Sequence, residues 1–322
     1  MGQVISVSRR TDVPAFYGPW FMNRLSEGFA AWRNPFGGQC HLVSLRRPDV
    51  VCLAFWSKNF RPFLPALAEI RRLGYPCFFN YTINALPPAL EGNVVPADDA
   101  VDSLAELADR FSPEQITWRY DPIVLSGVTP PAYHEARFAE LAARLHGRTG
   151  RVYISFVARY ARVERNFAEF ERLHGLRIED PPLPERQRLA RRLAALADTH
   201  GMPLHVCCND ALVGGPVYKG RCLDGGIMAR LAGGAWRGKA RPTRPGCGCV
   251  ASVDIGCYDS CPHGCVYCYA NVNKRRAAAV HAAHDPASVI LGCSRAVAER
   301  LVAAVRARTA AAAACDDRRG LT

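Results

Sequence analysis

Three cysteines near the carboxyl end of the chain have the type and spacing for metal chemistry. Cys261, Cys265 and Cys268 form a C-x3-C-x2-C array, and Tyr267 directly precedes the last of them. A proline and a glycine between them are turn residues, so a tight loop can bring the three sulfurs to one centre. Thiolates are soft ligands that select zinc, copper(I) or iron–sulfur clusters. Structural zinc and iron–sulfur clusters usually take four protein ligands, so a group of three indicates a cluster with one iron left open.

The stretch that contains them, CYDSCPHGCVYCYANVN, resembles the cluster loop of the radical S-adenosylmethionine (SAM) enzymes. In that superfamily three cysteines hold a [4Fe–4S] cluster, SAM chelates the fourth iron, and one electron cleaves SAM to a 5′-deoxyadenosyl radical. The resemblance implies that Cys261, Cys265 and Cys268 bind the cluster, that SAM is the cofactor, and that a flavodoxin or ferredoxin donates the electron. A zinc knuckle stays open as an alternative, because Cys257 could be a fourth ligand.

The elements that must position this loop alternate along the chain. Short apolar runs predict six strands, over residues 3–8, 50–56, 76–83, 115–120, 152–157 and 204–208. Helical spacing predicts helices over 17–27, 63–73, 100–111, 133–145, 185–199 and 295–313. Such alternation is typical of βα units around a parallel sheet. We therefore expect an α/β fold, a partial (β/α)6 TIM-like barrel, which is also the unit count that radical SAM enzymes commonly use. An eight-stranded barrel or a doubly wound sheet stays open.

The cluster loop lies at an unusual end of the chain. In most radical SAM enzymes the three cysteines follow the first barrel strand near the N-terminus, whereas here they come after residue 260 of 322. We therefore expect a permuted barrel in three parts. Residues 1–245 would form the partial barrel, 246–275 the cluster loop that closes its mouth, and 276–322 a helical tail.

Polar residues recur directly after the predicted strands, which is where a barrel carries its chemistry. We predict that Arg9, Arg10 and Asp12, which follow the first strand, contact the substrate. The predicted contacts to SAM are Lys58, Asn59, Asn80, Arg119, Asp121 and Tyr267. Arginine or lysine would bind the methionyl carboxylate, and asparagine or aspartate the ribose hydroxyls. A solvated turn is the alternative for any one of these groups.

A second group of cysteines lies between the sixth strand and the cluster loop. We predict a possible second iron–sulfur cluster on Cys208, Cys222, Cys247 and Cys249, with Cys207 as a substitute for Cys208. A zinc site on the same residues and no metal at all both stay open. Cys40, Cys52 and Cys77 are isolated in the sequence, so we interpret them as small buried apolar residues.

Several stretches along the chain together resemble a bacterial domain-of-unknown-function family that is noted for a C-terminal, radical-SAM-like cysteine cluster. They are ISVSRRTDVPAFYGPWF, RNPF, FWSKN, ITWRYDP, GRCLDG, CGCVASVDIGCYDSCPHGCVYCYAN and HDPAS. The resemblance covers about residues 1–292 and implies iron–sulfur binding. It brings no established substrate.

The formal net charge of +12 raises the question of nucleic acid. Lysine occurs only at positions 58, 219, 239 and 274, and the arginines are spread over many predicted helices. A solvated basic surface is therefore favoured over a nucleic-acid partner. No apolar run is long enough to span a membrane, and the start of the chain resembles a strand rather than a signal peptide, so we expect a cytoplasmic protein. The alternative to an enzyme is a zinc-stabilised basic α/β binding protein without catalysis.

Overall fold

The fold is built on one open sheet of eight parallel strands, in the order β10-β1-β4-β5-β6-β7-β8-β9. This is a computed structural model, and it describes residues 2–319, with side chains through residue 310. The strands are β1 Gln3–Val7, β4 Val50–Ser57, β5 Cys77–Thr82, β6 Ile116–Ile123, β7 Arg151–Phe156, β8 Leu204–Val206, β9 Val217–Lys219 and β10 Ser252–Asp254. The predicted parallel α/β fold and all six predicted strands are confirmed. Among the described residues β9 and β10 are the two edges of the sheet, and no pairing closes it into a barrel.

Four strands have no counterpart in the prediction. β2 (Phe29–Arg33) and β3 (Cys40–Ser44) form a separate antiparallel hairpin. β9 and β10 contain three residues each, so neither gives the apolar run by which a strand is found. β10 nevertheless matters for the architecture, because it pairs with β1 and forms the edge of the sheet on that side.

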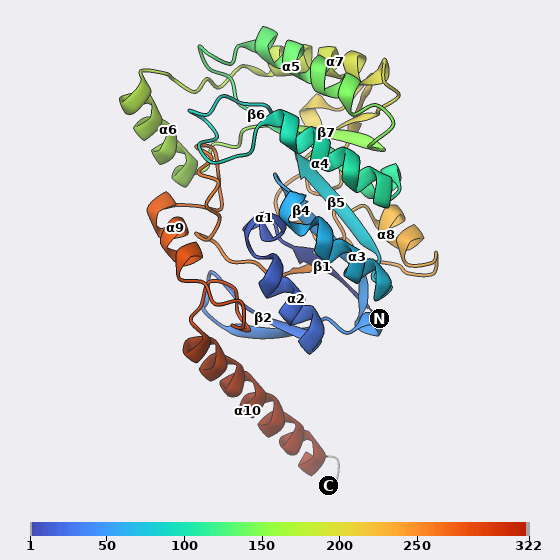
Figure 1. Cartoon of the computed structure of the whole chain (residues 1–322), viewed down its shortest axis with the longest axis vertical. Coiled ribbons are helices and arrows are strands. Elements are labelled where there is room, and N and C mark those ends of the chain that lie inside the picture. Colours follow the sequence, from blue (N-terminus) through green and yellow to red (C-terminus); the bar gives the residue numbers. More distant parts are fainter. Residues whose placement is uncertain (1, 320–322) are drawn as a thin grey trace.

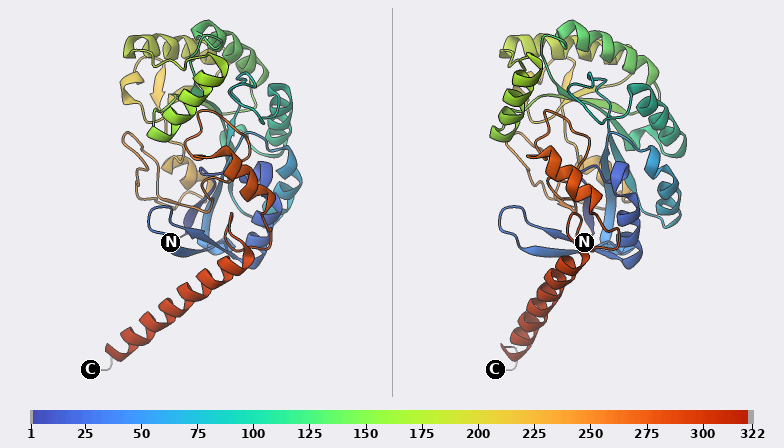
Figure 2. Two further views of the ribbon diagram at one scale, coloured as in Figure 1. Left: turned by 90° about the vertical axis from the view of Figure 1, so that its left-hand side faces the viewer. Right: turned by 60° about the vertical axis from the view of Figure 1, so that its left-hand side comes forward.

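The helices do not all lie on one face of the sheet. They are α1 Val13–Phe16, α2 Gly18–Glu27, α3 Leu64–Arg72, α4 Ala97–Arg110, α5 Pro131–Arg144, α6 Ala161–His174, α7 Leu183–Asp198, α8 Gly225–Leu231, α9 Lys274–Ala282 and α10 Arg295–Arg319. Five of them, α2, α3, α4, α5 and α7, pack on one face of the sheet, and α6, α8, α9 and α10 lie elsewhere. Figures 1 and 2 show the helices from α2 to α7 as an arc on the outer side. In both views of Figure 2, α9 lies inside this arc, while α10 extends away from the body. No helix within residues 2–319 has the length and apolar character needed to cross a bilayer.

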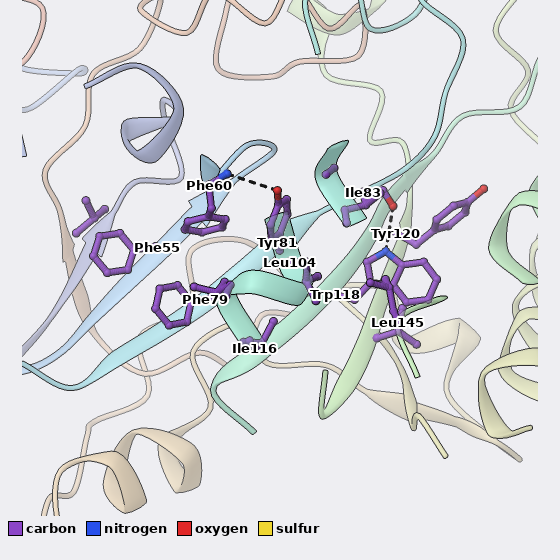
Figure 3. Close-up of a cluster of buried hydrophobic side chains, with 14 of the residues drawn as sticks. Phe55, Phe60, Phe79, Tyr81, Ile83, Leu104, Ile116, Trp118, Tyr120 and Leu145 are labelled. Carbon is purple, nitrogen blue, oxygen red and sulfur yellow. Dashed lines mark hydrogen bonds between the residues drawn. The ribbon is translucent and has the colours of Figure 1, made fainter. Parts of the chain in front are cut away.

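The main core lies between the sheet and these outer helices. Strand residues alternate between two faces, so Phe79 and Tyr81 of β5 point towards the helices (Figure 3). Trp118 of β6 stacks on Phe138 of α5 with ring centroids 4.8 Å apart, and its indole Nε1 donates to the carbonyl of Ile83. Burial of each large side chain contributes about 1.5–3 kcal/mol, so this face anchors the sheet.

The inner face of the sheet has a different character. Phe78, next to Phe79 on β5, belongs to a second cluster that includes Leu223 and Met228 from the segment around α8. This segment covers part of the inner face. The same face carries buried polar side chains, among them Asn80 and Arg119, and these lie near the predicted site.

Candidate functional site

The predicted cluster loop is delivered to the sheet by β10. The strand pairs in parallel with β1, so the loop leaves β10 at the same edge at which Arg9 leaves β1. The side chain of Asp254, the last residue of β10, fastens the two strand ends together. Its carboxylate accepts from the Ser6 hydroxyl at 2.5 Å, from the Ser8 hydroxyl at 2.6 Å and from the Arg9 amide at 2.8 Å.

The loop itself is held from several sides by backbone hydrogen bonds. The Val266 amide donates to the Leu90 carbonyl at 3.0 Å, and the Asn93 amide donates to the His263 carbonyl at 2.9 Å. Gly264 has a φ of +73°, a left-handed conformation that glycine adopts without steric cost. The residues around position 90, in the long connection between β5 and α4, therefore hold the backbone of the cysteine loop by hydrogen bonds.

The three cysteines of the loop interact with one another electrostatically. Burial raises the pKa of the Cys265 thiol to about 12, and the neighbouring charge of Lys58 opposes this rise. Burial, Asp12 and Cys268 raise the pKa of Cys261 well above its ordinary value, and burial raises the pKa of Cys268. Cys268 disfavours ionisation of the other two thiols, so a cationic centre would be needed before all three could be thiolates.

A buried ion pair lies beside the loop. Lys58 Nζ and Glu91 Oε1 are 2.7 Å apart, and the Lys58 ammonium stands 5.7 Å from the ring centre of Tyr267. The Tyr267 hydroxyl donates to the same Glu91 carboxylate, and Asn84 donates to the Tyr267 oxygen at 3.1 Å. Burial alone would lower the pKa of Lys58, but Glu91 and Cys265 more than offset it and the pKa is raised. Lys58 and Tyr267 thus lie together by the cluster loop, as their predicted role requires.

Asp12 connects the loop to the first two central strands. Its carboxylate accepts from the Ser57 hydroxyl at 2.7 Å and from the Lys58 amide at 2.8 Å, and it also lies 2.8 Å from His263 Nε2. It caps α1 through the Ala15 amide as well. A buried carboxylate with all these partners is suited to positioning the loop; its predicted contact with substrate stays a prediction.

Arg9, Arg10 and Asn59 are half-buried around the same strand ends. Arg9 donates to the Ser252 hydroxyl at 2.5 Å and lies over Trp56, and its carbonyl accepts from the Tyr269 hydroxyl. Arg10 lies between two aromatic rings, and one of its buried guanidinium nitrogens, Nη1, has no partner. The Asn59 side chain accepts from the Arg61 amide. All three stand at the edge from which the cluster loop emerges.

The remaining predicted SAM contacts lie farther along the sheet. Asn80 is fully buried on β5, and its amide nitrogen has no hydrogen-bond partner among the described residues. Arg119 and Asp121 of β6 form an ion pair with each other, and Arg119 also reaches the Asn80 oxygen at 3.5 Å. Arg119 donates to Cys222 Sγ at 3.1 Å, so this half of the predicted site adjoins the second cysteine group rather than the first.

The second cysteine group converges on the inner face. Cys207 Sγ lies 3.6 Å from Cys208 Sγ and 3.3 Å from Cys222 Sγ. Cys249 lies in the same buried cluster as Cys207 and Cys222, and its sulfur accepts from the Leu223 amide at 3.4 Å. Cys247 lies at the margin, where the Thr243 hydroxyl donates to its sulfur at 3.6 Å. The predicted set is therefore brought together, but with Cys207 at its centre rather than as a substitute.

Several residues of the site were missed by the sequence reasoning, namely Glu91, Asn93, Asp254, His263 and Arg244. Glu91 and Asn93 lie in a connection without periodicity, so nothing marked them. His263 lies inside the cysteine array and Asp254 ends an unrecognised strand. Only His263 had a usable signal, which was its place between two predicted ligands.

The donor set at the predicted first site consists of thiols. Within residues 2–319 no group of three or more His, Cys, Asp or Glu side chains is gathered as a ready metal site, so a bound cluster stays a prediction. A [4Fe–4S] cluster takes each thiolate on a separate iron, so its cysteines stand farther apart than ligands of one ion. The donor set, three free buried or half-buried thiols and no carboxylate from the loop, suits iron–sulfur chemistry.

Comparison with known proteins adds a family. The model described as "Domain of unknown function (DUF1848)" matches residues 4–270, from β1 to the end of the cysteine array. No curated protein matches the chain.

Proposed function

The chain belongs to the family of the domain of unknown function DUF1848, and from its own residues we propose that it is a radical SAM-type iron–sulfur enzyme acting on a substrate still to be found. The observation that carries the proposal is the cysteine loop at the carboxyl end of β10. Burial, with smaller contributions from charges that include Cys268, raises the pKa of Cys261 and Cys265 there, and the sequence places the three cysteines in a C-x3-C-x2-C array. Three thiolates leave one iron of a [4Fe–4S] cluster open.

The strand order supports a permuted form of this fold. In most radical SAM enzymes the cluster loop follows the first strand of the barrel. Read from β10, the sheet runs β10-β1-β4-β5-β6-β7, with the loop after its first strand. These six strands are the proposed partial barrel, which β8 and β9 extend. The predicted division into residues 1–245, 246–275 and 276–322 stays a prediction, although β10 of the middle part pairs within the main sheet.

The bound cluster and SAM would supply one-electron cleavage of SAM to a carbon-centred radical. The chain's own work is to bind, orient and exclude water. Asp12 and Glu91 hold the loop and Lys58 in place. Lys58, already cationic beside Cys265, is suited to an anionic group of the cofactor. The unpartnered Asn80 amide and Arg10 guanidinium nitrogens are buried donors that a ligand could satisfy.

Anaerobic purification with iron reconstitution tests the proposal. We expect about four irons per chain at the first site and release of 5′-deoxyadenosine when SAM and dithionite are added. Cys265→Ser should lose both the iron and the deoxyadenosine, whereas Cys293→Ser, a cysteine outside both groups, should keep them. If the wild-type protein shows no iron–sulfur absorption after reconstitution, the proposal is wrong. The alternative, a zinc-stabilised basic binding protein without catalysis, would then be favoured.

A further inference from the structure

The second cysteine group is suited to a different metal from the first. The group consists of Cys207, Cys208, Cys222 and Cys249, with Cys247 at its margin. Three of the four are buried, with exposed fractions of 6%, 8% and 3% for Cys207, Cys222 and Cys249. They come from three separate stretches of chain: the end of β8, the loop after β9 and the residues before β10.

The distances between sulfurs separate the two kinds of metal centre. Zinc bonds thiolate sulfur at about 2.3 Å in a tetrahedron, so neighbouring sulfurs lie about 3.8 Å apart. In the second group the sulfur of Cys207 lies 3.6 Å from Cys208 and 3.3 Å from Cys222. Cys249 belongs to the same buried cluster as Cys207 and Cys222. Within residues 2–319 no three of these side chains are yet gathered around a single point. The spacing of the Cys207 sulfur from its two neighbours is therefore close to that of ligands of one ion, and movement of the side chains would complete the site.

Charge around the group also fits a tetrathiolate site. Four thiolates around Zn²⁺ carry a net charge of about −2, which needs compensation in a buried setting. Arg119 donates to Cys222 Sγ at 3.1 Å, and Arg244 reaches Cys207 Sγ at 3.8 Å. These two guanidinium groups, facing different sulfurs, supply that compensation. Hydrogen bonds from cationic donors to ligating sulfurs are the expected outer support of such a site.

We propose that Cys207, Cys208, Cys222 and Cys249 bind one structural zinc ion. The sulfur of Cys207 contacts those of Cys208 and Cys222, and Cys249 lies in the same buried cluster. Rotation about the χ1 angles would bring the four sulfurs around the ion. Binding releases the thiol protons to solvent. The ion ties the segment that covers the inner face to the end of β8, and so fixes the approach of β10 to the sheet.

Metal analysis of the wild-type chain gives the first test. Protein purified under reducing conditions should contain about one zinc per chain, before and after iron reconstitution. Replacement by cobalt(II) should give the visible d–d bands of a tetrahedral thiolate site. This measurement needs no variant. A chain that takes up about eight irons and no zinc would overturn the proposal. A chain that neither retains zinc nor binds added zinc would do so as well.

Variants then identify the ligands. Cys207→Ser and Cys222→Ser should each reduce the zinc content at least tenfold, while Cys247→Ser and the control Cys293→Ser should keep it. Circular dichroism checks that each variant is folded. Cys265→Ser should lose iron yet keep zinc, so failure of the radical SAM proposal and failure of the zinc proposal are told apart. Zinc that survives Cys207→Ser but not Cys265→Ser would assign the ion to the first loop.

Discussion

Glu91 connects the cluster loop to β4, because its buried carboxylate contacts both Tyr267 of the loop and Lys58, which follows β4. Its carboxylate pairs with Lys58 and accepts from Tyr267, and its side chain is 4% exposed. Nothing in the sequence marked it, because the residues from 84 to 96 have no strand or helix periodicity. Lys58 and Tyr267 were found because one follows a strand and the other precedes a cysteine. The residue that joins them becomes visible only after folding.

Replacement of Glu91 by alanine should destabilise the chain strongly. Removal of one partner leaves the Lys58 ammonium buried without compensation, which costs about 3–5 kcal/mol. Glu91→Gln keeps an acceptor for Tyr267 and should cost less. Urea unfolding of both variants measures the difference. Equal stability of Glu91→Ala and wild type would show that Lys58 reaches solvent and that the pair does not support the loop.

Cys207 shows a second limit of prediction at this scale. Two adjacent cysteines follow β8, and the sequence gives no reason to prefer either. The prediction named Cys208 and gave Cys207 as its substitute. A positive φ of 54° at Cys208 interrupts the side-chain alternation of an extended strand, so both sulfurs can reach the same centre.

At the scale of elements, the contact between β10 and β1 decides where the cluster loop stands. Gly256 follows β10 at a point of close approach: a Cβ placed on it would lie 2.0 Å from Ser8 Oγ and 2.5 Å from Ser8 Cβ. The Ser8 hydroxyl is itself engaged with Asp254. The two strand ends can therefore meet only if this position has no side chain.

Gly256→Ala should separate these strand ends. We expect a loss of about 1–3 kcal/mol in the free energy of unfolding, because the clash involves short, well-held atoms. Iron should be retained less well after desalting, since the loop is displaced. Gly127→Ala is the matched control, as a Cβ there meets nothing within 4 Å. Thermal unfolding and iron content are the two readouts; identical values for both variants would contradict this account of the β10–β1 contact.

The long elements were predictable and the short ones were not. Apolar runs such as Val50–Ser57 identify a buried strand without further information. The sequence of β10 is only Ser-Val-Asp, too short to identify a strand. It is extended because it pairs with β1. The place of the cysteines led us to expect a permuted order, which stays a proposal. β10, the strand on which that proposal rests, was not expected.

At the scale of the whole molecule, the positive charge is dispersed over the helical side. Surface arginines form local pairs with carboxylates, for example Arg137 with Glu140, Arg148 with Asp109 and Arg192 with Glu135. Pairing of this kind reduces the field that a nucleic-acid backbone would encounter. The formal net charge of +12 already subtracts the carboxylates, so these pairs spread the charge over the surface and leave the excess unchanged.

We therefore expect weak, sequence-independent binding to DNA that disappears near physiological salt. Fluorescence anisotropy with a labelled random duplex, measured from about 20 to 200 mM salt, would show it. A dissociation constant that stays below about 1 μM at the upper end would favour the basic binding protein instead. Heat-denatured chain serves as the control for non-specific charge attraction.

The pairing of β1 with β10 has a consequence for how the protein is made. The hydrogen bond from Ser6 to Asp254 joins residues 248 positions apart. A ribosome adds roughly 5–20 residues per second, so the edge of β1 waits on the order of 10–50 s for its neighbour. An unpaired strand edge invites association with other chains. The cysteine loop is synthesised later still, so delivery of the proposed cluster would follow translation of nearly the entire polypeptide.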